Sequence, residues 1–331
     1  MIIDVHNHFI GEAPKAFLIK EGKAQGIDAS EDAEGGLVLD FGGGRTLEAD
    51  RGFFDLDLRL KWLDDMGIDA QLVTIAPSHC LFGKDPSFTA EYLGVVNDHI
   101  AGLEKAHPGK FFPAAMVPLQ DVPKSVAEAD RAVNQLGARA VFMVSNVNGV
   151  YLDDARFDPL YEAVQGLGVP LFIHPAFPAA LDAMGDYHLS NICGFPFDQT
   201  LNLGRMVLSG VFERFPRLQA FYTHGGGTAP FLRGRWDHAY GAREDTSATI
   251  PKPPSAYLPQ IWLGSMVFYP PTLEFVIRSV GVDHVCLGSD YPYDMADPDP
   301  AGTVRKVGSL SDPEVNAVLG DNAKVLFELH S

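Results

Sequence analysis

Short, continuous apolar runs alternate with amphipathic stretches along nearly the whole chain. Such runs are typical of strands buried on both faces, which occur in parallel sheets. We expect these strands at residues 2–6, 70–77, 111–118, 139–145, 170–175, 218–225, 261–267 and 283–290. We expect helices at residues 55–67, 87–106, 123–136, 157–167, 198–214, 229–240, 271–280 and 311–328.

Eight successive strand–helix pairs predict an α/β fold, namely a closed but distorted (β/α)8 TIM barrel. The chain has 331 residues, and a barrel of about 250 residues or more commonly forms one domain. We therefore predict a single domain over residues 1–331.

One segment, residues 9–53, interrupts the alternation between the first strand and the first helix of the barrel. It contains GGLVLDFGGGRTLEAD, which has two short strand-like runs around three glycines. We interpret residues 9–53 as an insertion that carries a small β-hairpin at the mouth of the barrel. Long functional loops of a barrel belong at the carboxyl ends of its strands.

Composition excludes several classes of partner. The chain carries 25 lysines and arginines against 43 aspartates and glutamates, a formal net charge of −18. This charge repels nucleic acid and anionic lipid, and no apolar run reaches the ~18 residues of a membrane span. The three cysteines fit neither a disulfide framework nor a zinc ribbon, and MIIDVHNHF does not resemble a signal peptide. We expect a cytoplasmic protein.

The stretch DVHNHF, residues 4–9, holds two histidines one residue apart at the end of the first predicted strand. Residues two apart on a strand point to the same side, so His6 and His8 could reach one ion. Alone, the pair fits equally well with ordinary polar residues at a strand end. Asp4 could orient one of these histidines or simply begin the turn.

Three further polar residues end predicted strands, and they favour a metal site over ordinary polar residues at a strand end. His174 ends the fifth strand, His224 the sixth and Asp290 the eighth. The catalytic residues of barrel enzymes lie at such strand ends. His6 and Asp290 can share an ion only if the first and last strands are neighbours, as they are in a closed barrel. The sequence therefore predicts a metal site, and imidazole and carboxylate ligands with an open position suit catalytic zinc.

Several other residues lie near the predicted mouth. The glycines that follow His224 in HGGGTAPF would let substrate approach this histidine, although they also suit a plain turn into a helix. Arg233 and Arg235, and Arg45 and Arg51 in the insertion, could hold a substrate carboxylate; solvated surface arginines are the commoner alternative. We expect the remaining histidines, His79 among them, to be structural or exposed.

The motifs DVHNHF, FIHP, THGGG and LGSDYPYD, in this order, resemble the amidohydrolase superfamily. Within it, they are similar to the branch of aminocarboxymuconate-semialdehyde decarboxylase, and GVFERFPRLQAFYTHGGGTAPF is the most specific block. The resemblance implies a barrel with one divalent metal, usually Zn²⁺, with Mn²⁺ as the alternative. It implies that four residues are metal ligands, namely His6, His8, His174 and Asp290. It implies that His224 is the catalytic acid–base.

The resemblance also implies a homodimer or higher homo-oligomer, in which Arg235 can serve the site of the neighbouring subunit. The family also has an arginine in the insertion that holds the substrate carboxylate; Arg45 or Arg51 lies near that place, neither aligns without a gap, and Arg51 is the one that we expect to bind substrate. Phe177, after the fifth strand, and Tyr293, in LGSDYPYD, complete the expected substrate-binding residues. Asp290 is expected to take part in catalysis as well as in metal binding.

These expectations combine into one functional hypothesis and two alternatives. We expect a metal-dependent decarboxylase, a non-oxidative carbon–carbon lyase, acting on an unsaturated or hydroxylated aromatic carboxylic acid. The first alternative is a metal-dependent hydrolase or hydratase that uses the same site. The second is a metal-binding protein without turnover, which predicts a closed coordination sphere.

Overall fold

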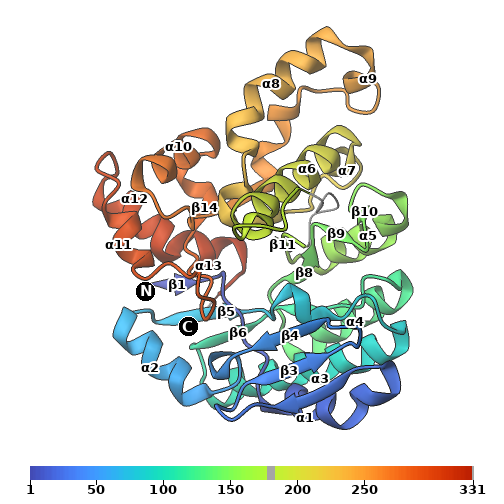
Figure 1. The fold of residues 1–331 in the computed structure, drawn as a ribbon. Helices are drawn as coiled ribbons and strands as arrows, with labels where there is room; N and C mark the ends of the chain where they lie inside the picture. Colours follow the sequence, from blue (N-terminus) through green and yellow to red (C-terminus); the bar gives the residue numbers. More distant parts are fainter. Residues whose placement is uncertain (177–182, 330–331) are drawn as a thin grey trace.

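Parallel strands form the centre of the molecule (Figure 1), which a computed structural model describes over residues 1–176 and 183–329. Each strand predicted from the sequence is present, in a shorter form. In chain order they are β1 (Ile3–Asp4), β5 (Ala70–Val73), β6 (Phe111–Pro113), β7 (Ala115–Met116), β8 (Val141–Val144), β11 (Leu171–His174), β12 (Ala220–Tyr222), β13 (Ile261–Gly264) and β14 (Val285–Cys286).

The strands pair in chain order in two parallel sheets, β1-β5-β6 and β7-β8-β11-β12-β13-β14. β6 and β7 are the two halves of the third predicted strand, which Ala114 separates. The first half pairs with β5 and the second half with β8. One strand therefore joins the two sheets, and this switch is one source of the distortion of the barrel.

Backbone hydrogen bonds join the first strand to the last. The Val5 amide donates to the Leu287 carbonyl at 2.9 Å, and the Asp290 amide donates to the His6 carbonyl at 2.7 Å. Asn7 forms a parallel bridge with Tyr291. The segments that follow β1 and β14 therefore lie side by side, and the predicted distorted (β/α)8 barrel is confirmed.

Helices follow the strands as predicted, with two differences in their bounds and one additional barrel helix, α11, that was not predicted. The segment expected as one helix over 198–214 begins earlier, at Phe195, and is interrupted before Val211. The last expected helix, 311–328, is interrupted by a π-helix, Ala317–Asp321. The helices of the barrel are α2 (Leu56–Met66), α3 (Pro86–Ala106), α4 (Val122–Leu136), α5 (Asp158–Leu167), α6 (Phe195–Leu208), α7 (Val211–Arg214), α8 (Ala229–Ala242), α10 (Pro270–Val280), α11 (Pro300–Arg305), α12 (Asp312–Asn316) and α13 (Asn322–Leu326).

The insertion is larger than the predicted hairpin. The hairpin itself is present as β3 (Leu37–Asp40) and β4 (Thr46–Ala49), but β2 (Asp28–Glu31) extends it to three antiparallel strands, and α1 (Glu12–Glu21) precedes them. The prediction missed β2 because its residues, DASE, are mostly exposed and show no apolar alternation. It missed α1 because that helix has little amphipathic character and packs on α3.

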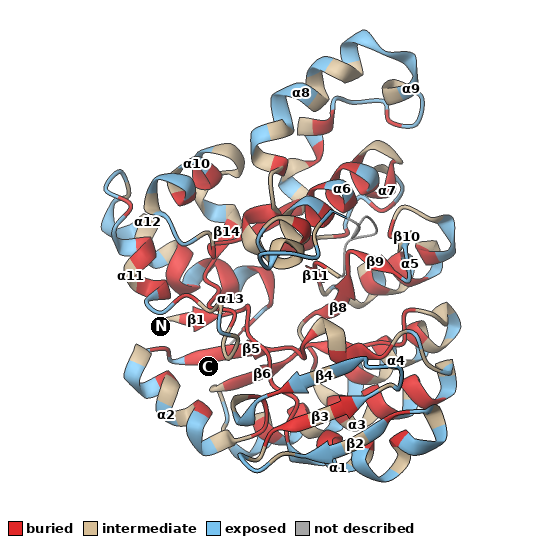
Figure 2. Cartoon of the chain, in the orientation of Figure 1, coloured by how far each residue is buried: buried red, intermediate tan, exposed pale blue. Residues whose placement is uncertain are grey.

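Burial follows the barrel, as Figure 2 shows: the central strands are buried and the outer helix faces are exposed. The helices α8 and α9 (Glu244–Ser247) depart from this pattern and extend away from the barrel (Figure 1). Ala229 is the one buried residue of α8, and the Phe231 side chain is 77% exposed. Among the helices of the described part of the chain, none is long and apolar enough to span a bilayer.

A fully buried arginine supports the backbone of the DVHNHF stretch. Arg59 of α2 donates to the His8 carbonyl, to Asn7 Oδ1 at 3.0 Å and to Gln71 Oε1 at 2.7 Å. Its guanidinium also lies 4.6 Å from the centre of the Phe9 ring. Within residues 1–176 and 183–329 it forms no ion pair, and burial lowers its pKa to about 10, so it remains charged at neutral pH.

We predict that Arg59→Met lowers the free energy of unfolding by about 2–4 kcal/mol, because three buried acceptors lose a charged donor. Urea unfolding would measure the loss. Arg51→Met is the control, because the Arg51 side chain is 59% exposed in its pair with Asp55 and such a pair contributes under about 1 kcal/mol. Equal losses in the two variants would contradict the prediction.

Candidate metal centre and active site

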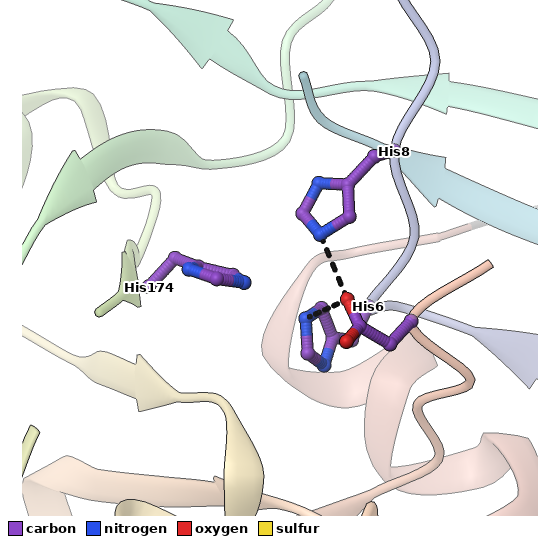
Figure 3. A group of neighbouring side chains, drawn as sticks. His6, His8 and His174 are labelled. Atoms are coloured by element: carbon purple, nitrogen blue, oxygen red, sulfur yellow. Dashed lines mark hydrogen bonds and ion pairs between the residues drawn. The ribbon is translucent and has the colours of Figure 1, made fainter. Parts of the chain in front are cut away.

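Four predicted ligands converge at the carboxyl ends of the barrel strands. His6 and His8 follow β1, His174 ends β11 and Asp290 follows β14. Each offers one ligand atom, and these four atoms all lie within 4.8 Å of one another. All four residues are buried, and Figure 3 shows the three imidazole rings directed toward a common space. The structure therefore brings together the predicted metal ligands.

Hydrogen bonds fix which ring nitrogen of two histidines faces that space. The Nδ1 of His8 lies 3.1 Å from the Ile75 carbonyl oxygen, and the Nδ1 of His174 lies 2.9 Å from the Pro175 carbonyl oxygen. A carbonyl can only accept, so each Nδ1 carries the proton and each Nε2 presents a lone pair. Both side chains thus have the tautomer that binds a metal through Nε2.

The contacts of Asp290 show why a cation fits. The Oδ1 atom of Asp290 lies 3.0 Å from His8 Nε2 and 3.2 Å from His6 Nε2. A carboxylate oxygen and an unprotonated Nε2 repel each other at this distance unless a cation lies between them. In the described structure the Nε2 of His174 is buried without any hydrogen-bond partner. These donor atoms match a divalent ion that is bound by imidazole and carboxylate.

The surroundings of His8, His174 and Asp290 keep these three ligands in their metal-binding protonation states. Burial lowers the pKa of His8, and it lowers that of His174 well below its usual value, so both are neutral at pH 7. Burial alone would raise the pKa of Asp290, but His6 and His8 outweigh it and hold that pKa well below its usual range. A neutral pair of imidazoles beside an ionised carboxylate is the set that a divalent metal requires.

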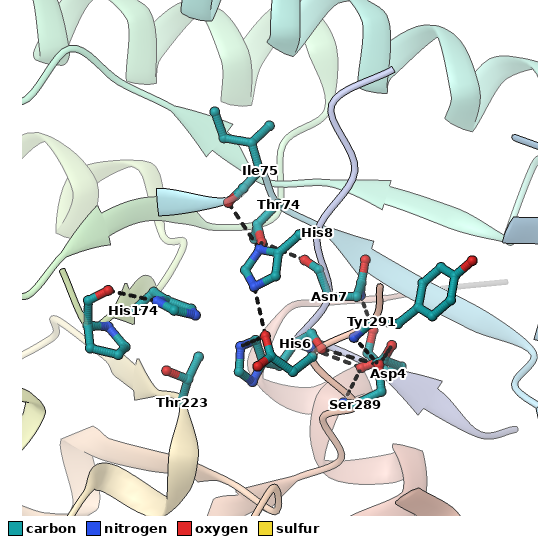
Figure 4. Close-up of polar contacts among 12 residues, drawn as sticks. Asp4, His6, Asn7, His8, Thr74, Ile75, His174, Thr223, Ser289 and Tyr291 are labelled. Carbon is teal, nitrogen blue, oxygen red and sulfur yellow. Dashed lines mark hydrogen bonds and ion pairs between the residues drawn. The ribbon is translucent and has the colours of Figure 1, made fainter. Parts of the chain in front are cut away.

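Asp4 links the ligand-bearing segments to each other (Figure 4). Its carboxylate accepts hydrogen bonds from the His6 amide at 3.1 Å, the Ser289 amide at 3.0 Å and the Ser289 hydroxyl at 2.7 Å. Gln71 of β5 donates to it at 2.8 Å. Asp4 therefore holds the backbone of His6 against the backbone of Ser289, and these contacts suit a residue that orients a ligand.

His224 lies directly beside the four ligands. Its ring centre is 4.7 Å from that of His6 and 5.2 Å from that of His174. Its backbone has a φ of +48°, a left-handed conformation that is disfavoured for a residue with a side chain. Its Nε2 is buried and has no partner in the described residues, and burial lowers its pKa to about 3. His224 is therefore a neutral imidazole with a free nitrogen beside the cluster.

The predicted substrate-binding residues differ in their placement. The Tyr293 ring contacts the His8 ring, with centres 5.3 Å apart, so it borders the cluster. Arg51 instead pairs with Asp55, and Arg235 is exposed on α8 without a hydrogen bond or ion pair to any described residue. Phe177 lies outside the described residues.

His79 borders the same region, although the sequence analysis treated it as structural. It follows β5 and is 1% exposed, and its Nε2 has no hydrogen-bond partner in the structure as described. Phe53 stacks on its ring and also contacts the Tyr293 ring. Its place in APSHC, just after the second strand, is the same signal that identified His174 and His224.

We predict that Mn²⁺ or Zn²⁺ raises the melting temperature, because an ion at about 100 times its Kd stabilises the folded state by about 2.7 kcal/mol. Calorimetry of the metal-free protein with and without added metal would measure the shift. His174→Ala should abolish it. His107→Ala, at the end of α3 before β6 and so at the opposite end of the barrel, should preserve it. A shift retained in His174→Ala would exclude this cluster as the metal site.

We also predict acid sensitivity of the metal-free protein from His79. Burial lowers its pKa to about 4 from 6.5, so between these values the unfolded chain binds more protons than the folded one. Stability therefore falls as the pH decreases from 6.5 to 4, by up to about 3 kcal/mol in total. Urea unfolding across this range should show that the free energy of unfolding depends less steeply on pH in His79→Gln than in the wild-type protein. The same steepness in both proteins would show that His79 is not the source of the acid sensitivity.

Comparison with known proteins agrees with this geometry. The model of an amidohydrolase family, Amidohydro_2, matches residues 3–329. The chain is 31% identical over 327 residues to 2-amino-3-carboxymuconate-6-semialdehyde decarboxylase of Dictyostelium discoideum, covering 97% of this chain and 90% of that protein.

Solved structures show the same fold. The 5-carboxyvanillate decarboxylase of Sphingomonas paucimobilis superposes with a TM-score of 0.84 at 25% identity, over 99% of each chain. The dihydroxybenzoic acid decarboxylase of Polaromonas sp. JS666, with bound manganese and the inhibitor 2-nitroresorcinol, gives 0.80 at 24% identity, over 99% of this chain and 97% of that one. Since the family model matches nearly the whole chain, this protein belongs to the amidohydrolase family, in the branch that its motifs predicted.

Proposed function

We propose that this protein is a divalent-metal-dependent decarboxylase acting on an unsaturated or hydroxylated aromatic carboxylic acid. The observation that carries the proposal is the buried cluster of His6, His8, His174 and Asp290 with the free nitrogen of His224 beside it. The named decarboxylase that is 31% identical over 97% of the chain supports the reaction class. The relatives named above are decarboxylases, and none favours the hydrolase or hydratase alternative.

Zn²⁺ is the metal that we propose, with His6, His8, His174 and Asp290 as its ligands. Three imidazoles and one carboxylate are a donor set that zinc prefers, and manganese in a protein of the same fold supports a divalent ion in general. When bound, such an ion acts as a Lewis acid and offsets negative charge on the substrate. The buried ligands contribute a dry surrounding, in which this charge is weakly screened.

The reaction requires a proton at the carbon that loses the carboxylate. The carbon–carboxylate bond breaks, CO₂ leaves, and the electron pair that remains on the carbon takes up one proton. His224 is the residue that we propose for this transfer, through its buried Nε2. Because the low pKa keeps this imidazole neutral at pH 7, its Nε2 first takes up a proton from solvent water, then gives that proton to the carbon and returns to the neutral form.

Recognition of the substrate is proposed to involve Tyr293, Phe177 and two arginines. Tyr293 is supported by its contact with the His8 ring. Arg51 could orient the substrate carboxylate after exchanging its partner Asp55. Arg235 is exposed on α8, a helix that extends away from its own barrel, and this position supports a homodimer in which Arg235 serves the other subunit.

We also propose a reducing, cytoplasmic location. It is supported by the three cysteines, Cys80, Cys193 and Cys286, which are free thiols in the structure. Cys80 and Cys286 are buried, where burial raises the thiol pKa and makes them unreactive.

The experiment is CO₂ release from a panel of aromatic and unsaturated acids by the metal-loaded protein. We predict that His224→Ala retains its metal but loses turnover by about 10²–10⁴-fold, because the proton donor is gone. Metal content and kcat are measured together, with His107→Ala as the control. Loss of metal from His224→Ala would make His224 a ligand instead. Hydrolysis or hydration of related compounds without CO₂ release would overturn the proposed reaction.

A further inference from the structure

Helix α6 places a row of polar side chains against the ends of three neighbouring strands. Asn202 donates to the Ser145 carbonyl after β8 at 2.6 Å, and Asp198 accepts hydrogen bonds from the Ser145 hydroxyl and from Tyr151. Both side chains are buried. A helix of a barrel normally packs on its strands through apolar residues. This face of α6 instead forms hydrogen bonds with groups at the strand ends.

Gln199 is the member of this row that reaches the active-site strands. It is fully buried, and its Nε2 donates to the Ile173 carbonyl at 3.1 Å and to the Thr223 carbonyl at 3.1 Å. The Thr223 hydroxyl lies 3.3 Å from the same nitrogen. Ile173 and Thr223 immediately precede His174 and His224. One amide group therefore bridges the peptide units that carry a metal ligand and the proton-transfer histidine.

The hydrogen-bond ladder between β11 and β12 ends at these two peptide units. The last bond between β11 and β12 runs from the Thr223 amide to the Ile173 carbonyl at 3.2 Å. Beyond it, His224 takes its left-handed conformation, and the Thr223 carbonyl has turned out of the ladder. The Thr223 carbonyl accepts a hydrogen bond from the Gly226 amide at 2.9 Å, and the Gln199 amide is a second donor that links this carbonyl to the Ile173 carbonyl.

The acceptor side of Gln199 argues against a packing role. Its Oε1 is buried and has no hydrogen-bond partner in the parts of the chain that are described. An unsatisfied buried amide oxygen is less stable than an apolar side chain of similar size. A residue that only filled space here would therefore be leucine or methionine. The advantage of glutamine at this position must come from the hydrogen bonds that its Nε2 donates.

We propose that Gln199 is a positioning residue that sets His174 and His224 relative to each other. It acts through the backbone, without touching substrate or metal. The part of the proposal that concerns proton transfer rests on the proposed function of His224. The part that concerns His174 rests on the ligand cluster and can be tested without turnover.

Two variants test this role. Gln199→Met keeps the length of the side chain but removes the donor, and Gln199→Glu keeps its shape but turns a carboxyl oxygen toward two carbonyls. We expect a weaker Co²⁺ affinity and an altered visible absorption spectrum of the bound Co²⁺. Loss of partners behind a ligand typically costs about 10–100-fold in metal affinity or activity, and we expect this loss in kcat with KM nearly unchanged. If one variant fails to fold, the other serves.

Asn97 supplies a matched control. On α3, its buried amide exchanges two hydrogen bonds with the backbone of Met116, at 2.8 and 2.9 Å, on a strand that carries no ligand. Asn97→Leu should lower stability but preserve the Co²⁺ spectrum and affinity. A wild-type spectrum, affinity and kcat in both Gln199 variants would overturn the proposal, as would an equal change in Asn97→Leu. If the wild-type protein releases no CO₂, the proposed function fails, but the Co²⁺ measurements still decide the role of Gln199.

Discussion

The seam between the first and last barrel strands is the contact on which the active site depends. His6 and Asp290 are 284 residues apart in the chain, yet the amide of Asp290 bonds to the carbonyl of His6 at 2.7 Å. The buried carboxylate of Asp4 ties both segments together, and Arg59 holds the carbonyl of His8 from behind. These polar contacts are fully buried, so each is strong in its low-dielectric surroundings and costly to break.

The same burial creates the chemistry of the cluster. It keeps the imidazoles of His8 and His174 neutral, and the contacts of Asp290 with His6 and His8 keep the carboxylate ionised beside them, an arrangement that a divalent cation relieves. The structure thus stores unfavourable polar contacts that metal binding would satisfy. Strain at His224 has a similar character, because its left-handed backbone is held by the fold around it, including Gln199.

Much of the fold and of the ligand set could be predicted from the sequence. Apolar runs mark buried parallel strands, and a polar residue at the end of such a run stands out, as His174 and Asp290 do. Arg59 and Gln199 could not be assigned in this way, because both lie on helices and their roles depend on groups more than 20 residues away in the chain. Local pattern carries no information on such contacts.

The sequence by itself determined the barrel, the candidate metal ligands and the family, because periodicity and motifs are properties of neighbouring residues. Tertiary structure decided the extent of the insertion, the ion pair between Arg51 and Asp55, and the exposure of Arg235 on α8. It also decided which ring nitrogens face the metal position, since carbonyls from other segments fix the tautomers of His8 and His174. The physical reason is that hydrogen-bond partners are chosen by proximity in space, which only the folded chain defines.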